Sequence, residues 1–316
     1  MSSSFDVIVV GRATIDAFLT IDENNKHFGV DLKKRQLCVR FGDKALVDKV
    51  DFLPGGNAAN VGVGLSRLGL RAAVAAEVGE DDFAKRVIVN LESEKTDSSL
   101  VISSEKPTDF SVIINTMGER TIFCEDLERE HNFDFSNFNT DWIYLTSLTK
   151  KWVEAYEKVL QLGQKNDAKI AFNPGTSQID AGYNFLSKFL KQTEILFVNK
   201  EEAQRIVSSK HGVFPKGIKE LLSEIAQMGV KTVVVTDGVN GSYVLQDGKF
   251  IEKNDIKDEA VERTGAGDSY AVGFLASYIK GQDLRICVDW GSINAASVVS
   301  RIGAQPGLLR FEEINK

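Results

Sequence analysis

The chain has 316 residues, enough for one large α/β domain or for a core with a smaller second unit, and 43% of them are hydrophobic. Its net charge of −7 does not favour a nucleic-acid-binding surface. No run of about 18 apolar residues predicts a membrane span, and the first residues lack the basic and apolar parts of a signal peptide. The three cysteines are far apart and indicate neither a disulfide framework nor a metal site, so we expect a cytoplasmic protein.

The N-terminal part of the chain predicts a buried strand followed by a β-rich insert. Residues 5–10 form an apolar run that ends at Gly11. Residues 13–53 predict no helix, and strand-like pieces alternate there with polar turns, at 17–21, 36–41 and 46–52. A second β-rich stretch, residues 109–125, contains Met117-Gly118-Glu119 as an expected hairpin turn. We expect the two inserts to pair with each other as a small β-sheet, a lid beside the core.

The rest of the chain alternates helices with strands. Helices are expected at 57–68, from 83, at 152–164, from 201, at 218–228 and at 288–299, with strands at 72–78, 143–145, 170–172, 195–198 and 232–235 and a hairpin turned by Asp247-Gly248. This alternation predicts a three-layer, Rossmann-like α/β core with a mainly parallel sheet and helices on both faces. The core would comprise residues 1–12, 54–108 and 126–316, and the lid residues 13–53 and 109–125. Ligands would then bind at the carboxyl ends of the strands.

Two common nucleotide-binding motifs are missing. The phosphate loop G-x-x-x-x-G-K-[ST] is absent, and Gly11-Arg12-Ala13 does not match the dinucleotide fingerprint G-x-G-x-x-G after the first strand. A nucleophile elbow G-x-S-x-G is absent as well. Any phosphate site therefore has to be built in another way.

The run Glu262-Arg263-Thr264-Gly265-Ala266-Gly267-Asp268 offers such a way, because three small residues precede an acid at the start of an apolar helical stretch that Gly281 would end. Backbone N–H groups converge readily at glycines, and a helix N-terminus adds partial positive charge, so the two together can seat a phosphate oxygen. A carboxylate beside that seat could take a proton from an attacking hydroxyl. The alternative is a glycine-rich turn with Asp268 as a simple N-cap.

A second motif, Leu53-Pro54-Gly55-Gly56-Asn57-Ala58-Ala59-Asn60, runs from the first β-rich insert into a helix. Its paired glycines suit a hinge. Asn60 would lie one turn into the helix, where it could bond a polar ligand. The alternative is a flexible turn with an ordinary N-cap asparagine.

Together, four motifs in this order resemble the ribokinase family, also called the phosphofructokinase B family of sugar and nucleoside kinases, over nearly the whole chain. The glycine–asparagine motif just described, with Gly69 and Gly79 downstream, resembles its N-terminal signature, and residues 264–268 resemble its C-terminal signature. Asn199-Lys200-Glu201-Glu202 resembles its N-x-x-E motif. Val235-Thr236-Asp237-Gly238, with Gly241, resembles its strand and glycine turn beside the nucleotide.

The resemblance implies a catalytic role for the C-terminal motif. Asp268 would be the catalytic base, and the backbone of Gly265, Ala266 and Gly267 would form the anion hole for the transferring phosphate. Asn199 and Glu202 would organise Mg²⁺, largely through water. These two residues could instead be a helix cap with its partner.

The resemblance also implies binding residues for the two substrates. Asp16 would bind a substrate hydroxyl, joined at the sugar by Gly55, Gly56 and Asn60, although Asp16 could be a turn residue. The nucleotide would be bordered by Thr236, Gly238, Gly241 and Asn294.

Arg120, in the second insert, could reach the substrate, although we expect a solvated hairpin arginine more than a ligand. Where many relatives have Asp-Thr, this chain has Glu262-Arg263, which puts in doubt a monovalent-cation site that some relatives build there.

The expected activity is transfer of the γ-phosphate of MgATP to a hydroxyl of a small sugar. A nucleoside kinase on the same fold is the first alternative, and a non-catalytic sugar- or nucleotide-binding regulator is the second. Whether the acceptor already carries a phosphate stays open, and Lys33-Lys34-Arg35 would permit it. The expected partners are small molecules, with neither nucleic acid nor membrane, and a homodimer through the lid is conceivable.

Overall fold

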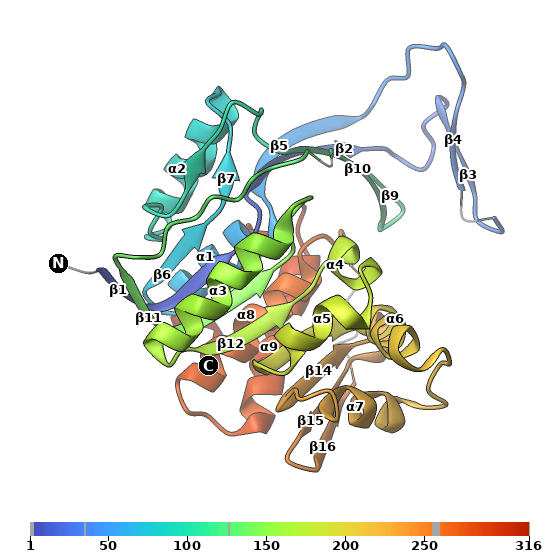
Figure 1. Cartoon of the computed structure of the whole chain (residues 1–316). Helices are drawn as coiled ribbons and strands as arrows, with labels where there is room; N and C mark the ends of the chain where they lie inside the picture. Colours follow the sequence, from blue (N-terminus) through green and yellow to red (C-terminus); the bar gives the residue numbers. More distant parts are fainter. Residues whose placement is uncertain (1–2, 35, 126, 255–259, 316) are drawn as a thin grey trace.

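The computed structural model describes residues 3–34, 36–125, 127–254 and 260–315, so Arg35 of the basic cluster lies outside the described residues. A large sheet and a separate smaller sheet dominate the molecule (Figure 1). Within the described part of the chain, no helix is both long and apolar enough to cross a bilayer.

The large sheet has eight strands in the order β16-β15-β14-β13-β12-β11-β1-β6. Its strands are β1 (Ser3–Val10), β6 (Ala72–Ala75), β11 (Phe138–Thr146), β12 (Lys169–Asn173), β13 (Thr193–Asn199), β14 (Thr232–Thr236), β15 (Ser242–Gln246) and β16 (Lys249–Lys253). The strands from β6 to β14 are parallel, whereas β15 and β16 add an antiparallel hairpin at one edge. A mainly parallel sheet was predicted from the alternation of helices and strands, and it is confirmed.

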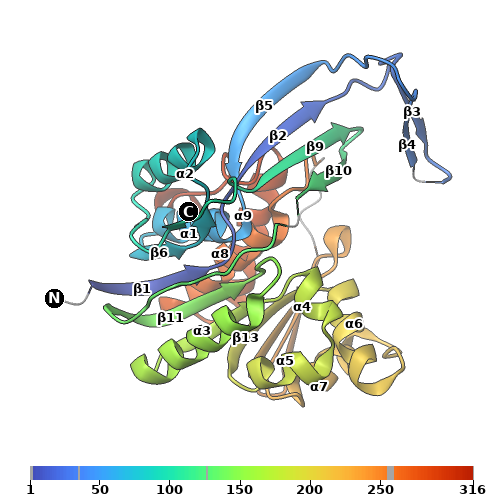
Figure 2. The ribbon, with the colours of Figure 1, turned by 45° about the horizontal axis from the view of Figure 1, so that its top comes forward.

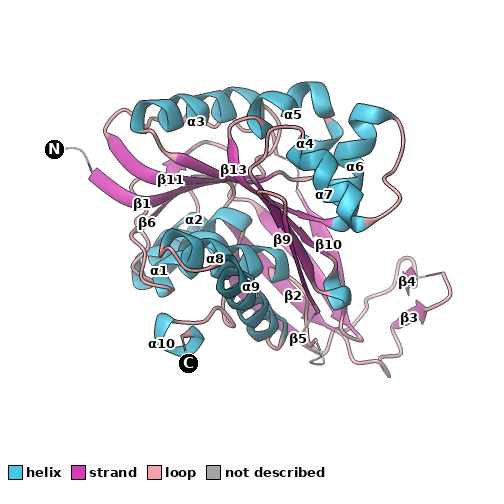
Figure 3. Ribbon diagram, turned by 90° about the horizontal axis from the view of Figure 1, so that it is seen from below, coloured by secondary structure: helices cyan, strands magenta, loops and turns pink. Residues whose placement is uncertain are grey.

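Helices cover both faces of this sheet (Figure 3), because alternate side chains of its strands are buried on opposite sides. In β1, Val7 and Val9 pack on one side, while Ile8 and Val10 pack on the other. The first side carries α1 (Asn57–Arg67), α2 (Asp82–Ser93), α8 (Ala266–Ile279), α9 (Leu284–Val299) and α10 (Phe311–Ile314). The second side carries α3 (Trp152–Asn166), α4 (Thr176–Asp180), α5 (Tyr183–Leu190), α6 (Lys200–His211) and α7 (Ile218–Ala226). The three-layer α/β prediction is therefore confirmed.

The two β-rich inserts form one four-stranded sheet, in the order β10-β9-β2-β5. Its strands are β2 (Thr14–Thr20), β5 (Lys49–Gly55), β9 (Phe110–Thr116) and β10 (Glu119–Cys124). The inserts are joined by the parallel pairing of β2 with β9, and β9 and β10 form the hairpin expected around Gly118. We call these four strands the lid sheet; it projects from the core in Figure 2. The boundary predicted at residue 53 differs from the strand end, because β5 continues to Gly55. The division into core and lid stays a prediction.

Two pairings of short strands were not predicted. A second hairpin, β3 (Phe28–Asp31) with β4 (Gln36–Val39), lies beyond the lid sheet, at its far end in Figure 2. A short parallel pair, β7 (Glu77–Val78) with β8 (Ile102–Ser103), lies in the core.

A buried ion cluster holds the chain segments that pass between core and lid sheet. Arg12, two residues after the end of β1, donates from Nε to Oδ2 of Asp109 at 2.8 Å. Arg129 donates to Oδ1 of the same carboxylate at 3.1 Å, and it also faces Glu77 at 3.5 Å. Because only 1% of the Arg129 side chain is exposed, removing Asp109 would leave this buried charge with Glu77 alone, at 3.5 Å. The cluster therefore fixes the base of the lid sheet.

Candidate active site

The predicted catalytic acid lies in the first turn of α8. The helix begins at Ala266, with Gly265 as its N-cap at φ 78°, so Asp268 is inside the helix and is not the N-cap. No side chain caps this end. The simple N-cap alternative for Asp268 is therefore wrong, and the start of α8 has only small residues in front of its amides.

Gly265 and Gly267 are glycines for different reasons. A Cβ on Gly265 would lie 2.4 Å from Cβ of Ala304, and its positive φ is unfavourable for other residues, so the backbone there requires glycine. A Cβ on Gly267 would meet nothing within 4 Å, and the residue is exposed. Packing does not require glycine at 267, but its lack of a side chain leaves open space at the start of α8. That is the space an anion would occupy.

The side chain of Asp268 is partly exposed and accepts a hydrogen bond from a residue of helix α1. Nδ2 of Asn60, in α1, donates to Oδ2 of Asp268 at 2.9 Å. Asn60 is the fourth residue of α1, and Gly56, with φ 87°, is the N-cap. Asn57 is therefore not the N-cap that the alternative interpretation required. The glycine–asparagine motif and the C-terminal motif, 208 residues apart, meet directly.

Loss of solvent around the first turn of α8 raises the pKa of Asp268 to about 6. The hydrogen bond from Asn60 and the charge of Arg120 oppose this shift, while the carboxylates of Glu202 and Asp16 add to it. A base with a pKa near 6 is ionised at neutral pH yet accepts a proton more readily than an ordinary aspartate. Because the charges of Asp16 and Glu202 act on this pKa, the acid predicted to bind the sugar and the acid predicted to organise the metal ion both lie near Asp268.

Asp16, in β2, is 6% exposed and lies against the paired glycines. A Cβ on Gly55 would be 1.9 Å from its Oδ2, so only glycine admits the carboxylate there. Oγ1 of Thr14 donates to Asp16 at 2.9 Å, and Ser111, in the neighbouring strand β9, also bonds it. Burial nevertheless raises the pKa of Asp16. Asp16 is a buried strand residue and does not lie in a turn.

Asn199 and Glu202 lie at the start of α6, where they form a reciprocal capping box. The Glu202 amide donates to Oδ1 of Asn199 at 2.9 Å, and the Asn199 amide donates to Oε2 of Glu202 at 2.8 Å. Burial raises the pKa of Glu202. In the described residues, no group of three His, Cys, Asp or Glu side chains could hold a metal ion. A single carboxylate fits Mg²⁺ only as an ion that keeps most of its water and is bound through phosphate oxygens.

The predicted nucleotide residues occupy two places. Thr236 ends β14, where it is paired with Asn199 of β13, and the turn from Gly238 to Gly241 follows directly. Gly238 has φ 53°, and a Cβ there would meet nothing within 4 Å. Asn294, in α9, is fully buried, and both ends of its amide are engaged: Nδ2 donates to the Ser269 carbonyl at 2.7 Å and Oδ1 accepts from the Leu309 amide at 3.0 Å. This side chain holds α8 to α9, and its contact with a nucleotide stays a prediction.

Glu262, before the anion-hole residues, is 1% exposed. Its Oε1 accepts hydrogen bonds from the amide and hydroxyl of Thr264, at 2.7 and 2.5 Å. Its Oε2 and the Nε of Arg263 are buried without a hydrogen-bond partner among the described residues. The side chain thus shapes the turn that leads into α8.

A match to a known family covers nearly the whole chain. Residues 6–310 match the model of the pfkB family of carbohydrate kinases. The chain belongs to the pfkB family. As a pfkB protein it is a kinase, a phosphotransferase with an alcohol group as acceptor. The predicted family resemblance is confirmed.

Three similar proteins place this pfkB kinase among its relatives. An uncharacterised sugar kinase of Archaeoglobus fulgidus is 27% identical over 78% of this chain and 99% of its own length. A nucleoside kinase of Methanocaldococcus jannaschii is 29% identical over 82% of this chain and 83% of its own. The structure of Arabidopsis thaliana ribokinase, complexed with ribose and ATP, has a TM-score of 0.76 at 20% identity and covers 99% of this chain and 98% of its own. The last likeness shows the fold.

Some residues at the site of this pfkB kinase were missed or undervalued from the sequence. Arg120, expected as a solvated arginine, is exposed but lies close enough to lower the pKa of Asp268. The turn of its hairpin also approaches the core, since a Cβ on Gly118 would lie 3.1 Å from the Ala260 carbonyl oxygen. Gln305 has no sequence signal at all, yet its Nε2 donates to Oδ1 of Asn60 at 3.2 Å.

Proposed function

We propose that this kinase transfers the γ-phosphate of MgATP to a hydroxyl group of a small sugar, with Asp268 as the base. One observation carries the proposal: a carboxylate with a pKa of about 6 stands beside an uncapped helix start that has open space at Gly267. The carboxylate would accept the proton of the attacking hydroxyl, while the amides around Gly265–Gly267 would hold the transferring phosphate. Phosphoryl transfer requires mainly this positioning and charge stabilisation.

The remaining residues divide between the two substrates. Asp16, fixed by Thr14 and Ser111, would accept hydrogen bonds from sugar hydroxyls at the base of the lid sheet. Thr236, Gly238 and the neighbouring turn would border the nucleotide. Mg²⁺ would supply charge neutralisation between the phosphates, and Glu202 would orient its water ligands. A monovalent cation beside Glu262 stays a prediction, as does the cytoplasmic location.

A nucleoside acceptor is the second candidate. It is favoured by the M. jannaschii nucleoside kinase, which is 29% identical to this chain. The sugar is preferred because the family model describes carbohydrate kinases. Asp16 and Asn60 offer polar contacts that the hydroxyl groups of either acceptor could use. Both candidates use the same base and the same anion hole.

An acceptor panel tests the proposal. Ribose, fructose, fructose 6-phosphate, adenosine and cytidine are each incubated with MgATP, and ADP and the phosphorylated product are measured. The highest kcat/KM is expected with a free sugar, and activity only with the nucleosides would support the second candidate. Asp268→Asn is the control, because it should remove the product with every acceptor. Substrate-dependent thermal shifts without any phosphate transfer would contradict both candidates and indicate a binding regulator.

We also propose that two chains pair through their lids. Ten of the eighteen exposed large hydrophobic side chains in the described residues lie in 13–53 and 109–125, which are less than a fifth of the chain. Every residue of the edge strand β10 is exposed. Exposed apolar surface and an unpaired strand edge both favour association.

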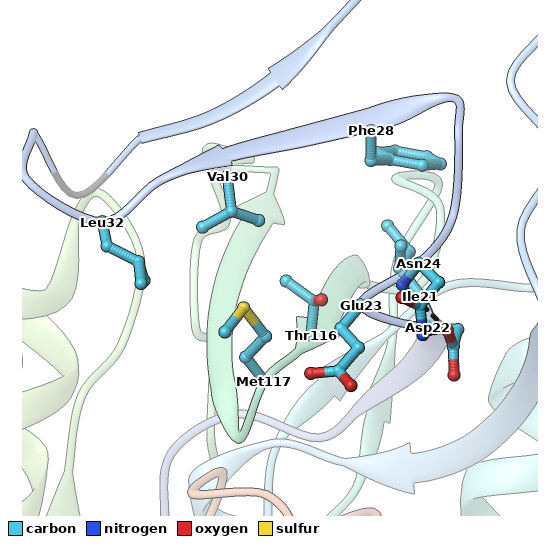
Figure 4. A pocket seen from close by; sticks show the side chains of 9 residues that line it. All are labelled: Ile21, Asp22, Glu23, Asn24, Phe28, Val30, Leu32, Thr116 and Met117. Atoms are coloured by element: carbon cyan, nitrogen blue, oxygen red, sulfur yellow. Dashed lines mark hydrogen bonds between the residues drawn. The ribbon is translucent and has the colours of Figure 1, made fainter.

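A lid cavity of about 310 Å³ lies between the β9–β10 turn and β3 (Figure 4), and none of the predicted site residues lines it. Phe28, Val30 and Leu32 line one side of this cavity and Met117 the other.

Light scattering of the wild type and of Phe41→Ser, which replaces a fully exposed aromatic, is the test for pairing. A dimer that Phe41→Ser weakens is expected, and a wild-type monomer at all concentrations would contradict the proposal.

A further inference from the structure

A chain of three amides, of which Gln305 and Asn60 are buried and Asn90 is half-buried, leads from α2 to Asp268. Nδ2 of Asn90, in α2, donates to Oε1 of Gln305 at 2.8 Å. Nε2 of Gln305 donates to Oδ1 of Asn60 at 3.2 Å, and Nδ2 of Asn60 donates to Asp268 at 2.9 Å. Asn60 and Gln305 are each 4% exposed, so solvent does not compete strongly for these bonds. Each amide therefore fixes the orientation of the next.

The direction of this chain matters because an asparagine can present either its oxygen or its nitrogen to a neighbour. If Oδ1 of Asn60 faced Asp268, an acceptor would meet a carboxylate, and the bond would be lost. The donor on Gln305 holds Oδ1 on the far side and so turns the NH₂ group toward Asp268. Asn90 fixes Gln305 in the same way, by occupying its oxygen.

The backbone around Gln305 is itself tied down. Arg67, in α1, donates to the carbonyl oxygens of Gln305 and Leu308, both at 2.8 Å, and its guanidinium is paired with Glu94. The preceding residue, Ala304, packs against Gly265 at the start of α8. One short loop thus supports both the anion-hole backbone and the amide that bonds Asp268.

We propose that Gln305 is a positioning residue for catalysis, which acts through Asn60 to keep a donor on the Asp268 carboxylate. The inference depends on the proposed role of Asp268 as base. It has a consequence for the acceptor substrate: with one N–H on Asp268, Asn60 keeps its second N–H, which a substrate oxygen could accept.

The test compares Gln305→Met, which keeps the length of the side chain and removes its donor, with Arg301→Gln. Arg301 donates to the Pro306 carbonyl at 2.9 Å and supports the same loop without entering the amide chain, so it is the matched control. We expect Gln305→Met to lower kcat roughly tenfold, with KM for ATP within about twofold of the wild type. The acid limb of its pH–rate profile should move to higher pH, because the hydrogen bond from Asn60 lowers the pKa of Asp268 and would be weakened in this variant.

The charged groups that face Asp268 are Arg120 on β10, Glu202 on α6 and Asp16 on β2, and all are unchanged in this variant. Arg301→Gln should leave kcat and the acid limb as in the wild type. The same kcat and limb in Gln305→Met as in the wild type would overturn the inference.

A double-mutant cycle separates this role from simple structural support. In an Asn60→Ala background, Gln305→Met should change kcat by less than about twofold, because the residue through which it acts is gone. An equal loss in both backgrounds would overturn the inference. If Gln305→Met does not fold, Asn90→Leu is tested in its place. Its acid limb should also move to higher pH, by a smaller amount than expected for Gln305→Met. An acid limb at the wild-type pH would overturn the inference. Full activity of Asp268→Asn would instead remove the proposed function itself.

Discussion

Two helix starts at the site solve the same physical problem in opposite ways. The first amides of any helix lack partners within the helix. At α6 the chain satisfies two of these amides itself, with the reciprocal bonds between Asn199 and Glu202. At α8 it supplies no side-chain cap and leaves open space at Gly267. The difference supports the proposal that the α8 start receives an external anion, whereas side-chain bonds occupy the α6 start.

The strongest way to break this comparison is to fill the space at Gly267. Gly267→Val puts a side chain where the transferring phosphate would lie, so kcat/KM should fall roughly a hundredfold, comparable with the loss of one anion-hole donor. The free energy of unfolding should change by less than about 1 kcal/mol, because nothing lies within 4 Å of the new Cβ.

Gly217→Val is the control, because this glycine is the N-cap of α7 and also has open space around it. It should leave the activity unchanged. Steady-state kinetics and urea unfolding of both variants decide, and a Gly267→Val enzyme with normal kcat/KM would mean that the space serves no ligand.

The stability of Asp268→Asn tests how much the ionised carboxylate of Asp268 lowers the free energy of unfolding. The pKa of Asp268 is about 6 in the folded chain and about 3.9 when unfolded, so ionisation destabilises the native state. This penalty is absent below about pH 4, grows as the pH rises, and is complete above about pH 6. The amide that replaces the carboxyl group never ionises, and its oxygen can still accept the bond from Asn60. Asp268→Asn should therefore be more stable than the wild type at pH 7.5, by about 3 kcal/mol at most.

Urea unfolding at pH 7.5 and pH 4 measures this difference. Most of the advantage of Asp268→Asn should disappear at pH 4, where the wild-type carboxyl is protonated in the folded state and about half protonated in the unfolded state. An equal or lower stability at pH 7.5 would show that the carboxylate is well solvated, contrary to its raised pKa.

A smaller effect is expected at α6, where capping and metal binding can be separated. Asn199→Ala removes the cap and should lower the free energy of unfolding by about 1 kcal/mol. It should also raise the Mg²⁺ concentration for half-maximal rate several-fold. Asn199→Ser keeps a capping oxygen, so it should restore stability but not the affinity for Mg²⁺. If Asn199→Ser restored both, the residue would be a cap and nothing more.

The sequence predicted those structural features that depend on residues close together in the chain. The apolar periodicity and Gly281 located α8, and Met117-Gly118 located the lid hairpin, because both depend on neighbouring residues. Asn60 was placed one turn into its helix for the same reason. The short helices α4 and α5 and the strand β3 were missed, since so few residues carry little periodicity, although the strand-like piece at 36–41 covers β4.

Long-range polar contacts could not be predicted. Gln305 and Asn60 are 245 residues apart, and neither side chain shows by its type that it will be buried. Arg129 would be expected at the surface, yet a buried cluster at the base of the lid sheet holds it. Such groups become recognisable only when the fold brings their partners together.

The central claim is that the carboxylate of residue 268 takes the proton of the acceptor hydroxyl. It is tested most directly by the single-turnover rate of phosphoryl transfer in wild-type and Asp268→Asn enzyme between pH 5 and 8. The wild-type rate should rise about tenfold per pH unit below about 6 and then level off. Asp268→Asn should be slower by roughly two to four orders of magnitude and should show no such limb. A folded Asp268→Asn enzyme within tenfold of the wild type, or one with the same acid limb, would contradict the account.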